Sequence, residues 1–296
     1  MIGIIGSGNV GANMAFFIAE KGVDNVLLYD VKEGLAQGKS LDMMEASPIR
    51  GYSTWIHSTG KPEDILNCEI AIVTAGNVRK PGMRREDLFI ENKEMIEKIA
   101  QSFSRYKGVV IIVTEPVDML TMLFLEKSGL QPRQVMGLGG CLDSTRLRFL
   151  IARELGVSME NVTALVVGRH SDSMIPLKEY CRVSGVPAES LMKEEKLEAL
   201  FYETKNAGGM IVEMAQRASS FYGPSAVAAD LAEAIFRDSK RIISVSHLFS
   251  GQYGIANVCL SLPAVIGATG IEKTLQPQLN TDQEKLLRQS AEEVRK

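Results

Sequence analysis

The sequence is poor in cysteine and has no clustered thiols, which excludes several kinds of site. Its four cysteines, at positions 68, 141, 181 and 259, are widely spaced and form no CxxC pair. This spacing excludes a zinc-finger type of metal site and a disulfide framework. We therefore expect four buried thiols and no bound metal.

Long hydrophobic runs and an excess of one charge are also absent. The longest apolar stretches, such as residues 108–113, fall far short of the roughly 18 residues that span a bilayer. Lysine and arginine number 33 against 36 aspartates and glutamates, a net charge of −3, so the basic surface that nucleic acid requires is missing. These absences exclude a membrane span and a nucleic-acid partner, and they favour small-molecule chemistry.

What is present matches an ordinary globular protein. At 296 residues, with 45% hydrophobic and 23% charged residues, the chain can bury a full core in one large α/β unit or in two domains. Met1 leads directly into the apolar residues 2–5, with no basic leader or small-residue cleavage site. We therefore expect a cytoplasmic protein that is folded throughout.

The first half of the chain alternates short apolar runs with segments of helical periodicity. Strands are predicted at residues 2–5, 25–29, 69–74, 108–114 and 135–138, and helices at 10–19 and about 85–106. This alternation is typical of an α/β fold with a Rossmann-type doubly wound parallel sheet. A helix at about 143–155 follows, and we place the domain boundary at its start. Residues 1–141 would form a dinucleotide-binding domain, and residues 142–296 a C-terminal α+β catalytic domain.

The second half is predicted to mix helices with antiparallel strands. A strand at residues 161–167, a long helix at about 189–218 and a helix after Pro224 come first. Antiparallel strands at 241–245 and 255–262 follow, joined by a glycine-containing turn. A terminal helix spans 281–296, and Thr281 with Glu284 would form its capping box.

A glycine-rich segment directly after the first predicted strand points to a dinucleotide site. Its glycines match GxGxxG and open a helix whose N-terminal amides and dipole can hold a pyrophosphate. An aspartate about 20 residues further on, at the end of the second strand, can accept hydrogen bonds from ribose hydroxyls. The alternative, a glycine turn with a capping aspartate, does not explain why all these elements arrive in the required order. The expected contacts are Gly6, Gly8, Asn9, Val10, Gly11 and Asp30.

The acidic residue in this pattern also indicates which cofactor is bound. Asp30 would repel the 2′-phosphate of NADP, which favours NAD.

A basic loop follows the predicted strand at 69–74. Four cations, Arg79, Lys80, Arg84 and Arg85, lie within seven residues around a Pro-Gly turn. Guanidinium groups bind carboxylates bidentately, and the loop belongs to the sheet edge where open α/β sheets bind their ligands. We interpret it as a positively charged lid, the alternative being a solvated basic loop.

One of the three histidines lies on a polar loop after a predicted strand. His170, within G-R-H-S-D-S, has the character of an acid–base group, although spacing alone leaves a structural role open. His57 and His247 have aromatic or apolar neighbours and look structural. Asp143 and Arg146 stand at i and i+3 on one helix face, where a surface ion pair is the alternative to a site.

Taken together, these motifs resemble the lactate/malate dehydrogenase family, most closely its lactate-dehydrogenase-like malate dehydrogenases. The similarity covers nearly the whole chain, in segments that begin at residues 6, 29, 33, 75, 141, 168 and 251 and read GSGNVG, YD, EGLAQGKSLDMMEASPI, AGNVRKPGMRREDL, CLDSTR, GRHSDS and GQYGI.

The resemblance implies a reversible hydride transfer between malate and NAD, giving oxaloacetate and NADH. His170 would accept the hydroxyl proton, and Asp143 would orient it. Arg146 would bind the C1 carboxylate, and Arg85 would polarise the C2 carbonyl as the lid closes. Arg79 occupies the position that pairs with the second carboxylate of the substrate. The implied partner is therefore a small dicarboxylate, malate or oxaloacetate.

The resemblance also extends the cofactor site and implies an assembly. Asn92, the Val113 to Glu115 turn and Ser220 would lie beside the dinucleotide. Members of this family are homodimers or homotetramers, and the sequence does not choose between them.

Two positions depart from the family pattern. Glu115 stands where the family has an asparagine that donates to the substrate oxygen, and Arg169 stands where it has an acid before the histidine. Because the two changes have opposite sign, we hypothesise that Glu115 and Arg169 form a compensating pair at the edge of the substrate site, which keeps the local charge near that of the family pattern. A dehydrogenase for another 2-hydroxy acid, or a weakly active NAD-binding relative, remains the alternative.

Overall fold

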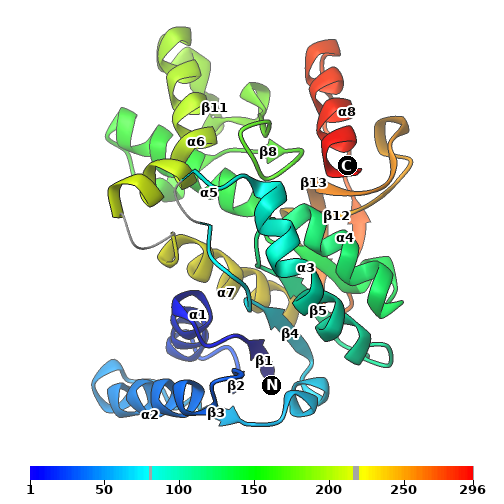
Figure 1. Cartoon of the computed structure of the whole chain (residues 1–296). Coiled ribbons are helices and arrows are strands. Elements are labelled where there is room, and N and C mark those ends of the chain that lie inside the picture. Colours follow the sequence, from blue (N-terminus) through cyan, green and yellow to red (C-terminus); the bar gives the residue numbers. More distant parts are fainter. Residues whose placement is uncertain (80–81, 216–219, 296) are drawn as a thin grey trace.

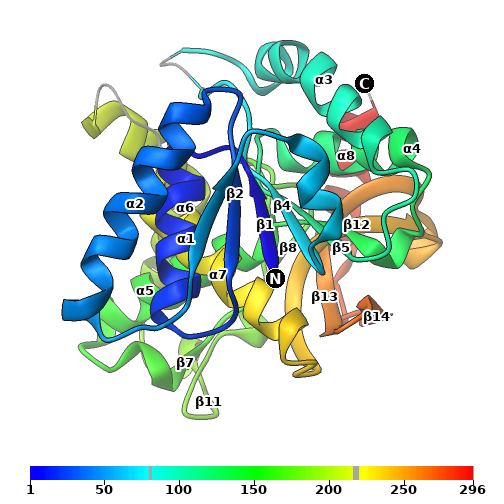
Figure 2. The same cartoon turned by 90° about the horizontal axis from the view of Figure 1, so that it is seen from below.

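The computed structural model describes residues 1–79, 82–215 and 220–295. One nine-stranded sheet runs through the molecule in the order β14-β13-β12-β6-β5-β4-β1-β2-β3, with helices on both faces (Figures 1 and 2). The parallel strands are β1 Ile2–Ile5, β2 Val26–Tyr29, β3 Ile56–Thr59, β4 Ile70–Val73, β5 Val109–Ile112 and β6 Val135–Gly137. The helices of this half are α1 Asn9–Glu20, α2 Glu33–Arg50, α3 Arg85–Ser102 and α4 Val117–Ser128.

The central strands are apolar along their whole length because both of their faces are covered. Along β4, Ile70 and Ile72 join a core with α1 and α7 (Tyr222–Phe236), whereas Ala71 and Val73 join the core formed with α3 and α4. Successive side chains of a strand point to opposite faces, so a two-sided sheet needs continuous hydrophobic runs. The predicted doubly wound sheet is confirmed, and its first six strands have the Rossmann order 3-2-1-4-5-6.

The glycine-rich turn joins β1 to α1 in a space that admits no side chain at two positions. Gly6 has φ +104°, a backbone conformation that favours glycine, and a Cβ on Gly11 would lie 1.9 Å from the carbonyl oxygen of Gly6. Apart from Gly8 and its two chain neighbours, no heavy atom of the described residues lies within 4 Å of a Cβ built on Gly8. The turn is therefore tight on its protein side and open on the side that faces the sheet edge.

The second half extends the same sheet with antiparallel strands and adds two small sheets. The remaining elements are α5 Gly140–Leu155, β7 Val162–Thr163, β8 Val166–Val167, β9 Ile175–Pro176, β10 Arg182–Val183, β11 Val186–Pro187, α6 Glu194–Ala215, β12 Arg241–Ser250, β13 Ala256–Gly267, β14 Gly270–Thr274 and α8 Thr281–Arg295. Strand β12 pairs with the last parallel strand through Ser246 and Gly137. The antiparallel strands predicted here exist and are longer than expected.

Three sequence expectations in this half need correction. The strand expected at 161–167 is broken into β7 and β8, which belong to different small sheets. The long helix begins at Glu194, because residues 188–190 form a separate 3-10 turn; its expected end at 218 lies outside the described residues. The capping box of α8 uses Asn280 and Gln283, which exchange backbone and side-chain hydrogen bonds of 2.9 Å, and not Thr281 and Glu284.

Two absences concern the described residues only. No helix among them is long and apolar enough to cross a membrane. They also contain no group of three acidic, histidine or cysteine side chains that could hold a metal ion. The four cysteines are free and buried, as expected.

Candidate active site

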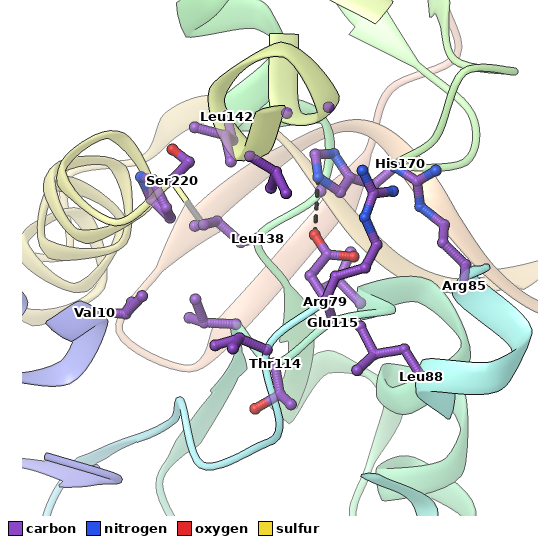
Figure 3. A pocket seen from close by; sticks show the side chains of 18 of the residues that line it. Val10, Arg79, Arg85, Leu88, Thr114, Glu115, Leu138, Leu142, His170 and Ser220 are labelled. Atoms are coloured by element: carbon purple, nitrogen blue, oxygen red, sulfur yellow. Dashed lines mark ion pairs between the residues drawn. The ribbon is translucent and has the colours of Figure 1, made fainter. Parts of the chain in front are cut away.

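A cavity of about 320 Å³ lies where the carboxyl ends of β4, β5 and β6 meet α5, α6 and the loop after β8 (Figure 3). Each parallel strand delivers a loop to this edge, so residues from distant parts of the sequence share one space. The lining includes most of the site residues expected from the sequence: Val10, Arg79, Arg85, Val113, Glu115, Arg146, His170 and Ser220.

His170 is buried and is held at three atoms. Its Nδ1 lies 2.7 Å from Oδ2 of Asp143, and its Nε2 lies 2.9 Å from Oε1 of Glu115. Its backbone N–H donates to Oδ2 of Asp118 at 2.7 Å. Asp143 is 1% exposed, so only the Glu115 side of the ring opens to the cavity. Both the position of the ring and the direction of Nε2 are therefore set by carboxylates.

The charges of this cluster shift one another strongly. Burial alone would lower the pKa of His170, but the carboxylates of Asp143 and Glu115 outweigh burial and raise it to about 10. Burial alone would raise the pKa of Glu115, but His170, Arg85 and Arg146 lower it to about 2. Both groups are thus charged near neutral pH, and they form an ion pair.

The sequence analysis missed Asp118, which lies in the first turn of α4. Its Oδ1 accepts a hydrogen bond of 2.5 Å from Ser246 on β12, so it ties the His170 loop to the antiparallel part of the sheet. Burial raises the pKa of Asp118 to about 6. A sequence signal was present: the residue is an acid inside a hydrophobic helix start, just beyond the carboxyl end of a predicted strand.

The predicted basic lid divides into two parts. Arg79 and Arg85 line the cavity, whereas Arg84 is exposed and pairs with Asp87 at 2.9 Å. Lys80 lies outside the described residues. Burial and the nearby Arg85 lower the pKa of Arg79, which indicates that cations are gathered here. Among the three cations of this loop that the structure describes, the interpretation as a solvated loop therefore holds for Arg84 alone.

Further cations reach the cavity from the helices of the second half. Arg146 on α5 lies 3.6 Å from Asp143, as its spacing predicted, and it faces the cavity. Lys205 on α6 also lines the cavity and was missed by the sequence analysis. The neighbouring Gly208 and Gly209 of α6 lie against the guanidinium groups of Arg146 and Arg79. Helix α6 thus forms the wall opposite the lid.

The expected cofactor residues form a path from the glycine turn to the cavity. At one end, Asp30 accepts hydrogen bonds from the backbone N–H groups of Ser7, at 2.7 Å, and Lys32, at 2.9 Å. Oxygen atoms of Asp30 thus lie beside the open surface of the glycine turn and the N-terminus of α1. At the other end, Val10, Val113 and Ser220 line the cavity together with Leu138, Leu142 and Pro224. An anion-binding turn, a carboxylate and an apolar cleft are what a dinucleotide requires.

Asn92 acts differently from the other expected cofactor residues. It is completely buried and is not part of the cavity lining. Its Nδ2 donates to the carbonyl oxygen of Glu115 at 2.8 Å, and its Oδ1 accepts from the backbone N–H of Asn77 at 2.7 Å. Asn92 therefore holds the loops after β4 and β5 together.

The hypothesis that Glu115 pairs with Arg169 is wrong. Arg169 contacts Glu293 on α8 at 2.9 Å and Glu86 on α3 at 3.3 Å, whereas Glu115 contacts His170. Arg169 and His170 are consecutive, and their side chains leave the loop in different directions. The charge of Arg169 is thus neutralised outside the cavity, and Glu115 keeps its own partner inside it.

The other two histidines do not reach the cavity. His57 stacks on Trp55 at the exposed end of the sheet, and His247 is buried, with its ring nitrogens on Val245 and Thr274.

Comparison with known proteins agrees with this geometry. A family model described as the lactate/malate dehydrogenase NAD binding domain matches residues 1–137, and one for the alpha/beta C-terminal domain matches residues 141–296. The chain belongs to the lactate/malate dehydrogenase family. As a member of this family it is an NAD-dependent oxidoreductase, and strands β1 to β6 fall in the family's NAD-binding domain.

Relatives resemble the chain over its full length. The malate dehydrogenase of Methanosarcina mazei is 40% identical and covers 100% of this chain and 97% of its own length. The crystal structure of Cryptosporidium parvum malate dehydrogenase has a TM-score of 0.96 and 34% identity, with 99% and 96% of the two chains covered. The lactate dehydrogenase of that organism, complexed with lactic acid and β-nicotinamide adenine dinucleotide, has a TM-score of 0.95 and 31% identity, with 99% and 95% covered.

The ion pairs of His170 should make the stability depend on pH. Because its folded-state pKa of about 10 lies above the ordinary histidine pKa of 6.5, the stabilisation is complete below about pH 6.5 and is lost as the pH rises through about 10. When urea unfolding is measured across this pH range, the free energy of unfolding should fall more steeply with rising pH in the unsubstituted protein than in His170→Asn. Equal slopes in the two proteins would contradict the pairing.

Proposed function

We propose that the protein is an NAD-dependent malate dehydrogenase that interconverts malate and oxaloacetate. The observation that carries the proposal is the convergence of three guanidinium groups, those of Arg79, Arg85 and Arg146, on one cavity with the buried imidazole of His170. A dicarboxylate with a reacting oxygen between its two charges matches such a set. The full-length similarity to malate dehydrogenases supports the same assignment.

The cofactor would bind along the path from the glycine turn to the cavity. Backbone amides of the turn from Gly6 to Gly11 hold the pyrophosphate, and Asp30 accepts hydrogen bonds from ribose hydroxyls. Val10, Val113 and Ser220 provide the cleft for the nicotinamide end. When bound there, NAD supplies the hydride chemistry.

The side chains of the cavity divide the remaining work. In malate oxidation, Nε2 of His170 takes the proton of the C2 hydroxyl, and Asp143 stabilises the resulting imidazolium through Nδ1. Arg146 binds the C1 carboxylate as a planar fork, and Arg85 stabilises negative charge on the C2 oxygen. Arg79 binds the second carboxylate and thereby selects the dicarboxylate.

We also propose a division of labour between residues 1–141 and residues 142–296. The glycine turn, Asp30 and the lid arginines come from the first part, whereas Asp143, Arg146 and His170 come from the second. Substrate and cofactor would then meet between them. Four free, buried cysteines fit a reducing compartment, and we propose the cytoplasm.

Exposed apolar side chains support a homodimer or homotetramer. Leu41 and Ile49 on α2 are 62% and 90% exposed, and Val31 just before this helix is 87% exposed. Helix α2 lies at the outside of the molecule next to α1 (Figure 2). We expect sedimentation equilibrium to give a mass that is a multiple of 32.4 kDa, and we expect Leu41→Asp to lower that mass. A monomeric parent protein would contradict this assignment.

Activity can be tested by following NADH absorbance with oxaloacetate, pyruvate and longer 2-oxo acids. Oxaloacetate should be reduced fastest, and His170→Asn should lower turnover by about 100- to 10,000-fold while NADH still binds. Faster turnover of another 2-oxo acid would instead indicate a dehydrogenase for another 2-hydroxy acid. Tight NADH binding without any turnover would favour the weakly active relative.

The role of Arg79 can be tested by the ratio of two substrates. Arg79→Gln removes the cation for the second carboxylate, so kcat/KM for oxaloacetate should fall by about 10- to 100-fold, as expected for a lost charged hydrogen bond. Pyruvate has no second carboxylate, and its kcat/KM should change little. The matched control is Arg84→Gln, whose guanidinium points away from the cavity. An unchanged ratio in Arg79→Gln would exclude the proposed role.

A further inference from the structure

Both ring nitrogens of His170 face carboxylate oxygens. Nδ1 lies 2.7 Å from Asp143, and Nε2 lies 2.9 Å from Glu115. An ionised carboxylate only accepts hydrogen bonds, whereas a neutral imidazole has one donor and one acceptor. A neutral ring would therefore turn a lone pair toward one of the two carboxylates. Only the doubly protonated ring satisfies both contacts.

The surrounding charges favour the same protonation state. Asp143 on α5, Glu115 after β5 and Asp118 on α4 are the acids closest to the ring, and Asp172 lies on its own loop. The cations that line the same cavity are Arg85 on α3, Arg146 on α5, Lys205 on α6 and Arg79 after β4. Two of these cations, Arg85 and Arg146, help His170 to lower the pKa of Glu115. Glu115 therefore stays ionised and retains the imidazolium as its partner.

The place of Glu115 also bears on substrate binding. Since Asp143 occupies Nδ1, only Nε2 can exchange a proton with a ligand in the cavity. Glu115 uses that same nitrogen, as the dashed line in Figure 3 shows. Its backbone is fixed by Asn92, but its side chain is 40% exposed, so the carboxylate has room to leave Nε2.

We propose that Glu115 is a positioning residue that keeps Nε2 of His170 protonated and directed into the cavity, so that the free enzyme is set to reduce a 2-oxo acid. This inference rests on the proposed function. In the reduction, the reduced nicotinamide, when bound, would supply the hydride for the new C–H bond at C2. The carbonyl electron pair moves to the oxygen, which takes the proton from Nε2. The oxygen of Glu115 gives way to the substrate oxygen, and the neutral ring is later reprotonated from solvent.

The sign of the pH dependence follows from this arrangement. Reduction uses the imidazolium, which is present below the pKa of His170, so its rate should hold through neutral pH and fall above that pKa. Oxidation uses the neutral ring, so its rate should rise with pH toward the same value. Removing the charge of Glu115 should move both profiles to lower pH. The pH profiles of oxidation and reduction thus both report the ionisation of His170.

Histidine NMR tests the proposal without any substrate. The chain has three histidines, and His170→Asn identifies the signal of residue 170. In Glu115→Gln the amide can satisfy Nε2 of a neutral ring, so the titration midpoint of His170 should fall by about 1 to 3 pH units. Glu293→Gln is the matched control, because it removes a carboxylate from Arg169 and not from His170. A midpoint equal to that of the control would overturn the proposal.

The dependence of kcat/KM on pH provides the second readout. For Glu115→Gln we expect the inflections of the oxidation and reduction profiles to move together to lower pH by about 1 to 3 units, following the lower midpoint of His170. A parent protein that turns over no 2-oxo acid would refute the proposed function, whereas the NMR result would still decide the role of Glu115. If Glu115→Gln does not fold, Glu115→Asn removes the same charge with a smaller side chain. Profiles that stay in place in a folded variant would refute the inference.

Discussion

The arrangement of the site depends on one constraint, which is that the carboxyl ends of the parallel strands all lie at the same edge of the sheet. Backbone pairing sets β1, β4, β5 and β6 side by side, and each strand then delivers a loop to one edge of the sheet. The reversal of strand order between β1 and β4 leaves the crevice beside the glycine turn open. Because side chains pack on both faces of the central strands, a one-residue shift of register would exchange the two faces and disrupt both cores. The packing of the sheet therefore fixes where each strand ends and each site loop begins.

Charge inside the cavity is the second constraint. A buried ion is costly unless it is paired, and the cavity collects an imidazole, several guanidinium groups and acids in a small volume. Asp143 and Glu115 provide the pairing for His170, and Arg169 is neutralised separately by acids on α3 and α8. Two of the arginines that point into the cavity contact acids only at long range: Arg146 lies 3.6 Å from Asp143, and Arg85 lies 4.0 Å from Asp172. A ligand with two carboxylates would complete their neutralisation.

The parts that could be predicted from sequence are those in which local pattern and tertiary role coincide. The GxGxxG turn, Asp30 and the continuous apolar strands each follow from a local requirement, namely a helix N-terminus, a strand end or a two-sided sheet. The Asp143–Arg146 pair follows from helical spacing. Asp118 and Lys205 were missed because each is an ordinary charged residue of a helix until the fold brings Asp118 to the backbone of His170 and Lys205 to the cavity. The capping of α8 was misplaced by one residue, since Asn280 competes equally well with Thr281 for that position.

The partner of Glu115 could not be predicted from the sequence. Opposite charges at 115 and 169 suggested a compensating pair, yet consecutive residues of a loop can point in different directions. The amino-acid sequence by itself determined the doubly wound sheet, the dinucleotide turn and the kinds of group that line the site, because these depend on local spacing and on the period of apolar residues. Only the tertiary structure decided that Glu115 faces His170 and Arg169 faces Glu86 and Glu293. Partners far apart in the chain are chosen by how the loops and helices pack, and no local pattern encodes that choice.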